Sequence, residues 1–161
     1  MLFNDKTVCE GYARFYNILL HEAGIETCYV SSSDHAWNII KLGGHYFHSD
    51  TTWDDQFFSH EWFLRSDAEM KAAGGSHASW DISCPSQFHK FQNDTLPICE
   101  YSSGDVNADG KINTADLVSM SGFLHGISVA ENFDSVLSDL DYSGNADVFD
   151  LILLRRKLLS R

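Results

Sequence analysis

The sequence predicts two domains of different fold class: an α+β domain, with a helix packed on an antiparallel sheet, over residues 1–100, and a small all-α domain over residues 101–161. Three observations support this prediction. An apolar stripe at helical spacing near the N-terminus is followed by short segments rich in β-forming residues. The character of the chain changes near residue 100. Two acidic twelve-residue blocks then align with each other at a fixed offset, glycine on glycine and aspartate on aspartate.

The first predicted element is a helix over Val8–Ala23. Its apolar side chains recur every three or four residues, which places them on one face of a helix, and Gly24 suits the end of the last turn. We expect this face to pack on the sheet; it consists of Val8, Tyr12, Phe15, Tyr16, Leu19, Leu20 and Ala23.

Three strands are predicted next. Thr27–Ser31 is rich in β-forming residues. Ala36–Leu42 and His45–Ser49 form a predicted hairpin, because Gly43 and Gly44 between them tolerate the positive φ of a two-residue turn. In that register Leu42 faces His45.

The remainder of the first domain gives weaker signals. Glu61–Ala73 is predicted as a helix that ends at two glycines, and Cys84–Ser103, which contains both prolines, is predicted as irregular. Cys84 and Cys99 flank a polar stretch and could form a disulfide; separate buried thiols are the alternative that we favour.

Charge and hydropathy exclude two classes of partner. The formal net charge of −12 would repel the phosphates of a nucleic acid, and it fits a soluble protein with cation sites. No apolar run reaches the roughly 18 residues of a membrane span, and no signal peptide is visible in this chain. We therefore expect no nucleic-acid partner and no membrane insertion.

The two acidic blocks, Asp105–Asp116 and Asp139–Asp150, have the spacing of calcium-binding loops. Calcium takes six to eight hard oxygens, which a twelve-residue loop supplies from positions one, three, five, seven (a main-chain carbonyl) and twelve, with a glycine at position six. The predicted ligands are Asp105, Asn107, Asp109, the Lys111 carbonyl and Asp116 in the first loop, and Asp139, Asp141, Ser143, the Asn145 carbonyl and Asp150 in the second. Gly110 and Gly144 hold position six. Two loops in register predict two calcium ions, whereas turns that are merely solvated do not explain the apolar residue that follows position seven in both.

These loops depart from an ordinary EF-hand, because aspartate rather than glutamate stands at position twelve and no helix-like run precedes the first loop. Gly104 to about Leu159 resembles type I dockerin modules, which consist of two loop-plus-helix repeats, and Gly-Asp-Val-Asn-Ala-Asp-Gly-Lys-Ile-Asn is similar to the usual opening of that family. The resemblance implies an extracellular protein that binds a cohesin module of a cellulosome scaffold.

The resemblance also implies which residues contact the cohesin. They are two residues at loop positions ten and eleven and two in the following helix of each repeat: Thr114, Ala115, Ser121 and Gly122 in the first, and Val148, Phe149, Arg155 and Arg156 in the second. Because the two sets differ strongly, we expect a single binding orientation. The alternative for Val148 and Phe149 is packing in the core.

A candidate catalytic triad lies in the first domain. With a two-residue turn at Gly43-Gly44, Trp37 faces Asp50 and His35 lies opposite Thr52, so His35 and Asp50 are diagonal neighbours on one face of the sheet. Cys9 falls at the predicted start of the first helix, where the helix dipole and unpaired N–H groups favour a thiolate.

In this arrangement the Cys9 thiolate would attack an acyl carbon, His35 would give a proton to the leaving group, and Asp50 would orient the imidazole. The Cys9 N–H would be one oxyanion donor. On spacing alone, a buried cysteine and a structural histidine are the simpler interpretation. The other histidines show no spacing typical of metal ligands, so we assign no transition metal to His21, His45, His48, His60, His77 or His89.

Three segments that contain these residues strengthen the catalytic interpretation. Cys-Glu-Gly-Tyr-Ala at Cys9, His-Ala-Trp-Asn at His35 and Asp-Thr-Thr-Trp-Asp-Asp at Asp50 resemble the signature segments of the bacterial transglutaminase-like superfamily. The resemblance runs from about Leu2 to Trp80. It implies a papain-like fold, truncated at its N-terminus, with Cys9, His35 and Asp50 as the triad and Trp37 and Trp53 as walls of the site.

The sequence thus predicts a cellulosome-associated thiol acyltransferase, peptidase or amidase, acting on a peptide or amide and anchored by calcium-dependent binding to a cohesin. The alternative is a non-catalytic binding protein, whose only activity is the assembly of dockerin with cohesin.

Overall fold

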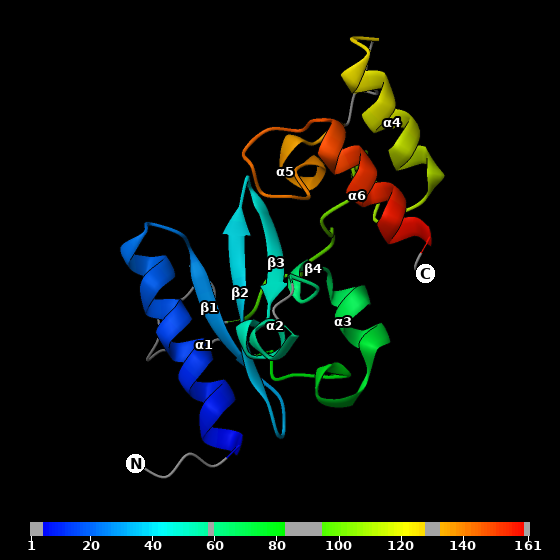
Figure 1. Ribbon diagram of the computed structural model, residues 1–161. Helices are drawn as coiled ribbons and strands as arrows, with labels where there is room; N and C mark the ends of the chain where they lie inside the picture. Colours follow the sequence, from blue (N-terminus) through cyan, green and yellow to red (C-terminus); the bar gives the residue numbers. More distant parts are fainter. Residues whose placement is uncertain (1–4, 58–59, 83–94, 128–132, 160–161) are drawn as a thin grey trace. The chain divides into compact units, whose positions relative to one another are not determined.

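The computed structural model describes residues 5–57, 60–82, 95–127 and 133–159 (Figure 1). The chain divides into two compact units, Met1–Glu100 and Tyr101–Arg161. The elements of the first unit are α1 (Asp5–Glu22), β1 (Thr27–Ser31), β2 (Ala36–Leu42), β3 (His45–Ser49), α2 (Thr51–Phe57), β4 (Phe63–Arg65), α3 (Asp67–Ala73) and the 3-10 turn η1 (Gly75–His77). Those of the second unit are α4 (Thr114–Leu124), α5 (Ser135–Ser138) and α6 (Val148–Leu159). Among the described helices, none has both the length and the apolar character that a bilayer crossing requires.

The first unit is built on one antiparallel sheet with the strand order β1-β2-β3-β4. The hairpin of β2 and β3 has the predicted register, with Leu42 opposite His45 and Asn38 opposite Ser49. Gly43 and Gly44 have φ angles of 58° and 92°. Glycine adopts such positive φ angles without strain because it has no Cβ atom. The three strands predicted from the sequence are confirmed.

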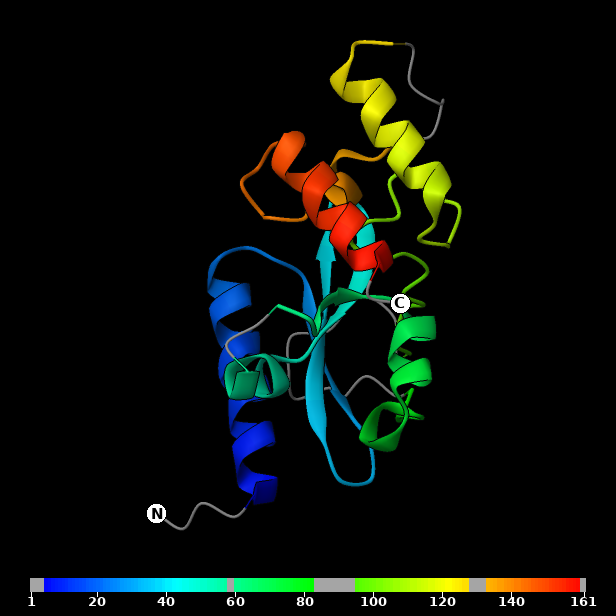
Figure 2. The same cartoon turned by 45° about the vertical axis from the view of Figure 1, so that its right-hand side comes forward.

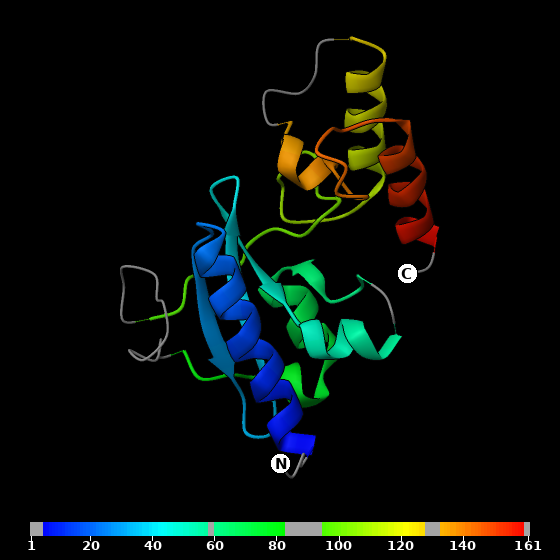
Figure 3. The ribbon, with the colours of Figure 1, turned by 60° about the vertical axis from the view of Figure 1, so that its left-hand side comes forward.

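Helices cover both faces of this sheet. Figure 2 shows α1 and α2 on one face and α3 on the other, and Figure 3 shows α1 lying across the sheet. Since successive side chains of a strand point to opposite faces, Ala36 packs with Cys9 and Ala13 of α1, whereas Trp37 packs with Met70 of α3. The main core therefore lies between the sheet and α3.

The predicted buried stripe of α1 is only partly correct. Leu20 is buried and Val8 and Tyr16 are half-buried, but Tyr12, Phe15 and Leu19 are exposed at 38%, 63% and 49%. The face that meets the sheet carries Leu20 together with the buried side chains Cys9, Ala13 and Asn17, also at helical spacing. Helix α1 lies close to β2, since the Ala13 carbonyl accepts a 3.0 Å hydrogen bond from the Asn38 side-chain amide. This close approach explains why the buried side of α1 includes small and polar residues.

The single helix predicted over Glu61–Ala73 is also wrong in its first half. Phe63–Arg65 forms the short edge strand β4, and the helix begins only at Asp67. Ser66 caps this helix, because its side chain accepts the Glu69 N–H at 3.2 Å. Serine is among the preferred residues at that position. Helix α2, which follows β3 directly, was not predicted from the sequence.

The cysteines occur in two states. Cys9 and Cys99 are buried thiols. Cys28 is disulfide-bonded. Because Cys99 is a free thiol, the predicted disulfide between Cys84 and Cys99 is wrong; Cys84 itself lies outside the described residues.

The second unit is a small helical module. Helices α4 and α6 pack side by side (Figures 1 and 3) around buried Val106, Met120 and Leu154. Ile112 and Ala146, the apolar residues that follow position seven of the two acidic loops, both pack against this cluster. The repeat in the sequence therefore places each loop on a common core.

Replacing Ile39 with alanine should destabilise the first unit by about 2–5 kcal/mol, because a cavity would remain in the core. Ile39 is fully buried there, whereas Ile18 is 53% exposed. Ile18→Ala is therefore the matched control, and it should change the stability by only about 0.5 kcal/mol or less. Urea unfolding followed by tryptophan fluorescence measures both. Equal effects of the two substitutions would contradict this packing.

Candidate functional site

The aspartate at position one of each acidic loop is held by main-chain N–H groups. Asp105 accepts the N–H groups at positions five and six, at 3.0 and 2.8 Å. Asp139 accepts the equivalent two N–H groups of the second loop, at 2.9 and 2.8 Å. These bonds curl each loop around its own first carboxylate.

The aspartate at position twelve closes each loop from the other end. Asp116 accepts the N–H groups at positions three and nine, at 3.2 and 2.8 Å. Asp150 accepts the equivalent groups at 3.0 and 2.7 Å, and also the Leu140 N–H at 2.7 Å. Both aspartates are fully buried at the start of a helix, so the two loops repeat nearly contact for contact.

The oxygen atoms of the second loop fit a calcium ion. Carboxylate oxygens of Asp139, Asp141 and Asp150 lie within 4.8 Å of one another, and the Ser143 hydroxyl lies 3.2 Å from the Asn145 carbonyl oxygen. All these donors are hard oxygens, which calcium prefers to nitrogen or sulfur.

In the first loop, burial and, to a smaller extent, the charges of Asp116 and Asp109 outweigh the opposing N–H bonds and raise the pKa of Asp105 to about 6. Burial likewise raises the pKa of Asp116. Negative charge thus accumulates in this loop beyond what the N–H groups neutralise, as expected for a site that a cation completes.

Most of the predicted cohesin-contacting residues lie at the surface. Val148 and Phe149 are exposed at 54% and 62%, so packing in the core is wrong for this pair. The other residues of the set are exposed or half-buried: Thr114, Ala115, Arg155 and Arg156 are exposed, and Ser121 and Gly122 are half-buried. The surface of the second repeat is apolar and basic, and that of the first is small and neutral.

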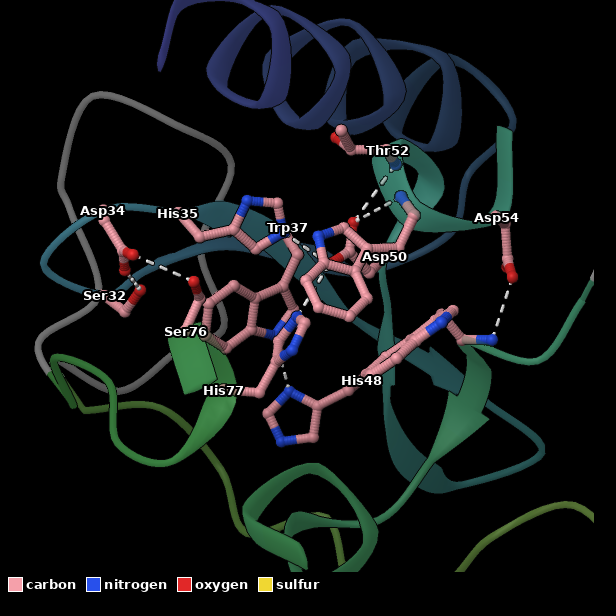
Figure 4. A network of polar contacts seen from close by, with 12 residues as sticks. Ser32, Asp34, His35, Trp37, His48, Asp50, Thr52, Asp54, Ser76 and His77 are labelled. Carbon is pink, nitrogen blue, oxygen red and sulfur yellow. Dashed lines mark hydrogen bonds and ion pairs between the residues drawn. The ribbon is translucent and has the colours of Figure 1, made fainter. Parts of the chain in front are cut away.

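In the first unit, the structure brings His35 and Asp50 together. The His35 Nε2 atom lies 2.5 Å from Asp50 Oδ2 (Figure 4). Asp50 follows β3, and its Oδ1 accepts the N–H groups of Thr52 and Trp53 at 3.1 and 3.2 Å. An aspartate that accepts such N–H groups acts as the N-cap of the helix, here α2.

The predicted pairing of His35 with Thr52 is wrong, because the chain turns into α2 immediately after Asp50. His35 and Asp50 meet all the same, at the end of the hairpin. Burial raises the pKa of Asp50, but the hydrogen bonds from His35 and His77 outweigh it and leave this pKa below its usual value.

Cys9 and His35 line the same pocket. This pocket has a volume of about 170 Å³ and lies between the second turn of α1 and the β1–β2 loop, with Tyr29 and Asp34 also in its wall. His35 immediately precedes β2, at the end of the sheet, so it can share a pocket with α1 although its strand neighbour Trp37 faces α3. Its ring lies 5.7 Å from the Trp37 ring and 5.9 Å from the Trp53 ring.

Cys9 does not lie at the start of the helix. Helix α1 begins at Asp5, so Cys9 is its fifth residue. In an α-helix the N–H of the fifth residue donates to the carbonyl of the first. The predicted use of the Cys9 N–H as an oxyanion donor is therefore wrong, and the dipole stabilisation expected at a first turn is reduced one turn further along.

Sequence reasoning missed His77. This fully buried side chain places its Nε2 atom 2.8 Å from Asp50 Oδ2, the same oxygen that His35 approaches. No motif or ligand spacing in the sequence indicates that His77 contacts Asp50, because 27 residues separate the two. Only the packing of η1 on the sheet brings them together.

A second cluster, formed by His48, Asp67 and Cys99, is a set of hydrogen bonds rather than a metal site. The indole N–H of Trp37 donates to His48 Nδ1 at 2.9 Å, and His48 Nε2 lies 2.9 Å from Asp67. Since an indole can only donate, Nδ1 must accept, and the proton of neutral His48 is on Nε2. That proton occupies the nitrogen that a metal shared with Asp67 would need. Burial holds the pKa of His48 below its usual value.

The fold and the loops define the class of the second unit. It is a module of two loop-plus-helix repeats, and its loops have the residue spacing of calcium-binding loops. Residues 103–159 match the family model of the dockerin type I domain, so this unit contains a dockerin domain. The chain matches none of the curated proteins with which it was compared.

Calcium binding by the first loop should weaken as the pH falls below about 6, the pKa of Asp105. The loss should be roughly tenfold per pH unit, because a protonated carboxyl is a poor ligand and one proton must be displaced. The stability of the metal-free unit should change in the opposite direction. The pKa of Asp105 is about 6 in the folded unit, above its ordinary value of 3.8, so the folded state binds this proton more tightly than the unfolded state does. The metal-free unit therefore gains stability as the pH falls from about 6 toward 4.

Calcium titration at pH 7 and pH 5 measures the first effect, and thermal unfolding of metal-depleted protein measures the second. Asp105→Asn is the control, which should reduce the pH dependence of stability in this range. Equal calcium affinity at the two pH values would contradict the assignment of Asp105 as a ligand.

Proposed function

We propose that this chain is a component of an extracellular cellulosome and that its dockerin domain anchors it, in a calcium-dependent manner, to a cohesin module of the scaffold. The observation that carries this proposal is the contact-for-contact repeat of the two acidic loops within a segment that matches the dockerin type I model. Two calcium ions, one in each loop, would be coordinated by the carboxylates and would neutralise the repulsion between them. Each ion would thereby fix the position of the helix that follows its loop, α4 or α6.

The second repeat is the proposed contact surface. Val148 and Phe149 are the first two residues of α6, and their apolar side chains are exposed beside the basic Arg155 and Arg156. Exposed aromatic and arginine side chains are the residue types that dominate protein interfaces. The four corresponding positions of the first repeat hold no aromatic or arginine side chain, which favours one binding orientation.

Val148→Glu/Phe149→Glu should weaken binding to a type I cohesin by roughly 100-fold, because it removes the apolar anchors of the proposed surface. Thr114→Glu/Ala115→Glu is the matched control. Both pairs are the first two residues of a helix. Glutamate favours the helix dipole at such positions, so neither double substitution should unfold the domain.

Titration calorimetry against a panel of recombinant type I cohesins measures both affinities, with excess chelator as a second arm in which binding should be lost. Equal losses in the two double variants would contradict the single orientation, and undiminished binding in chelator would contradict the calcium dependence.

A second candidate function, acyl transfer by the first unit, is supported by the pocket that Cys9 and His35 line and by the His35–Asp50 hydrogen bond. In this proposal the first unit is a transglutaminase-like domain with a papain-like fold. The Cys9 sulfur attacks the carbonyl carbon of an amide, the carbon–nitrogen bond breaks, and His35 gives the proton to the departing amine. Water then releases the acyl group from the sulfur. The position of Cys9 within α1 instead favours a non-catalytic first unit, because the Cys9 N–H cannot serve as an oxyanion donor.

Alkylation of Cys9 by iodoacetamide distinguishes the two alternatives. An acyl-transfer site requires a thiolate activated by His35, so the alkylation rate at pH 6–7 should exceed that of an ordinary thiol and should fall about tenfold or more in His35→Ala. Cys9→Ala provides the background from Cys99. A rate that rises only above about pH 8 would favour the non-catalytic alternative.

A further inference from the structure

Two imidazoles approach a single carboxylate oxygen in the first unit. His35 Nε2 and His77 Nε2 lie 2.5 and 2.8 Å from Asp50 Oδ2, while the other oxygen accepts two N–H groups from the first turn of α2. Figure 4 shows both rings turned toward Asp50. An ionised carboxylate can only accept, so each Nε2 atom must carry a proton.

The surroundings of His77 identify its tautomer. The ring is fully buried, stacked on Trp62 at 4.6 Å and edge-on to Trp53 at 4.7 Å and to Trp37 at 5.0 Å. Within the described part of the chain its Nδ1 atom has no hydrogen-bond partner. A bare lone pair among indole rings is tolerated better than a buried N–H without an acceptor, so the proton of His77 belongs on Nε2, facing Asp50.

The same reasoning decides between a hydrogen-bonded cluster and a transition-metal site. His35, Asp50 and His77 offer ligand atoms within 4.8 Å of one another. A metal on His77 Nε2 would move the ring proton to Nδ1, where nothing in the described part of the chain accepts it. Ligating histidines ordinarily donate that proton to a neighbouring group. The cluster is therefore built for hydrogen bonds.

The segment that carries His77 is tied to the segment that carries His35. The Ser76 hydroxyl donates to Asp34 at 3.0 Å, and this bond joins η1 to the β1–β2 loop (Figure 4). Hydrogen bonds from Ser76, Ser32 and Ser33 hold the pKa of Asp34 below its usual value. Two adjacent residues of η1 thus contact the loop and the carboxylate that together orient His35.

We propose that His77 is a positioning residue, which holds the Asp50 carboxylate so that His35 keeps its proton on Nε2 and presents the Nδ1 lone pair to the pocket lined by Cys9. This inference rests on the second candidate function above. With four donors on its two oxygens, Asp50 has no freedom to rotate away from His35. The lone pair of Nδ1 is the group that would accept the Cys9 proton.

The test compares two variants of the full chain. His77→Gln keeps an N–H donor near the position of Nε2, and His77→Phe keeps an aromatic ring between the tryptophans but loses the donor. Proton–nitrogen correlation NMR reads the tautomer of His35, and iodoacetamide alkylation across pH 5–9 reads the reactivity of Cys9. Thermal unfolding confirms that both variants are folded.

The wild type and His77→Gln should show His35 protonated on Nε2. His77→Phe should show a mixture of His35 tautomers and an alkylation rate at pH 7 at least about tenfold lower, because one of two donors on Asp50 Oδ2 is lost. An unchanged tautomer and an unchanged pH profile in folded His77→Phe would overturn the proposal and leave His77 as packing alone.

The wild type provides a reading that does not depend on the variants. Its His77 should carry a single ring proton on Nε2 at pH 7, and a proton on Nδ1 would overturn the proposal even if both variants fail to fold. If the tautomers are as expected but Cys9 reacts as an ordinary thiol, the positioning role of His77 stands and the acyl-transfer function fails.

Discussion

A buried aspartate that accepts main-chain N–H groups at the start of a helix is the interaction on which both units depend. Asp50 joins β3 to α2 in this way, and Asp116 and Asp150 join the acidic loops to α4 and α6. N–H groups at a helix N-terminus stabilise a negative charge that burial would otherwise make costly. Each such aspartate keeps one oxygen or one lone pair for a further partner. In the first unit that partner is a pair of imidazoles, and in the second it is the proposed cation.

This constraint explains how a small chain can hold charged groups in its interior. The dockerin domain has a modest apolar cluster around Val106, Met120 and Leu154, and its loops are ordered by hydrogen bonds from within each loop rather than by extensive burial. The opposing shifts of pKa follow from the partners that each carboxylate has. Histidine donors lower the pKa of Asp50, whereas burial beside other carboxylates raises that of Asp105 to about 6. The second environment favours a cation, and the first favours a fixed imidazole.

Features set by local chemistry were predictable from the sequence. The two glycines at the hairpin fixed the register of β2 and β3, and that register placed His35 beside Asp50. The internal repeat likewise predicted the loops, because ligand spacing within twelve residues is a local property. The same repeat carried the resemblance to dockerins, and the family-model match over residues 103–159 supports it. Features set by packing were not predictable: the buried face of α1 follows from the close approach of Ala13 to β2, and His77 reaches Asp50 only through the placement of η1. Apolar periodicity alone could not distinguish the exposed face, with Phe15, from the buried one.

In the function that we propose, the two acidic loops each close around one calcium ion and thereby order the surface that binds a cohesin. The most direct test is calorimetric titration of the metal-depleted chain with calcium, with Asp116→Ala and Asp150→Ala measured beside it. We expect two ions for the wild type and one for each variant, since each substitution removes the carboxylate at position twelve of a single loop. A wild-type chain that binds no calcium, or variants that still bind two ions with unchanged affinity, would contradict it.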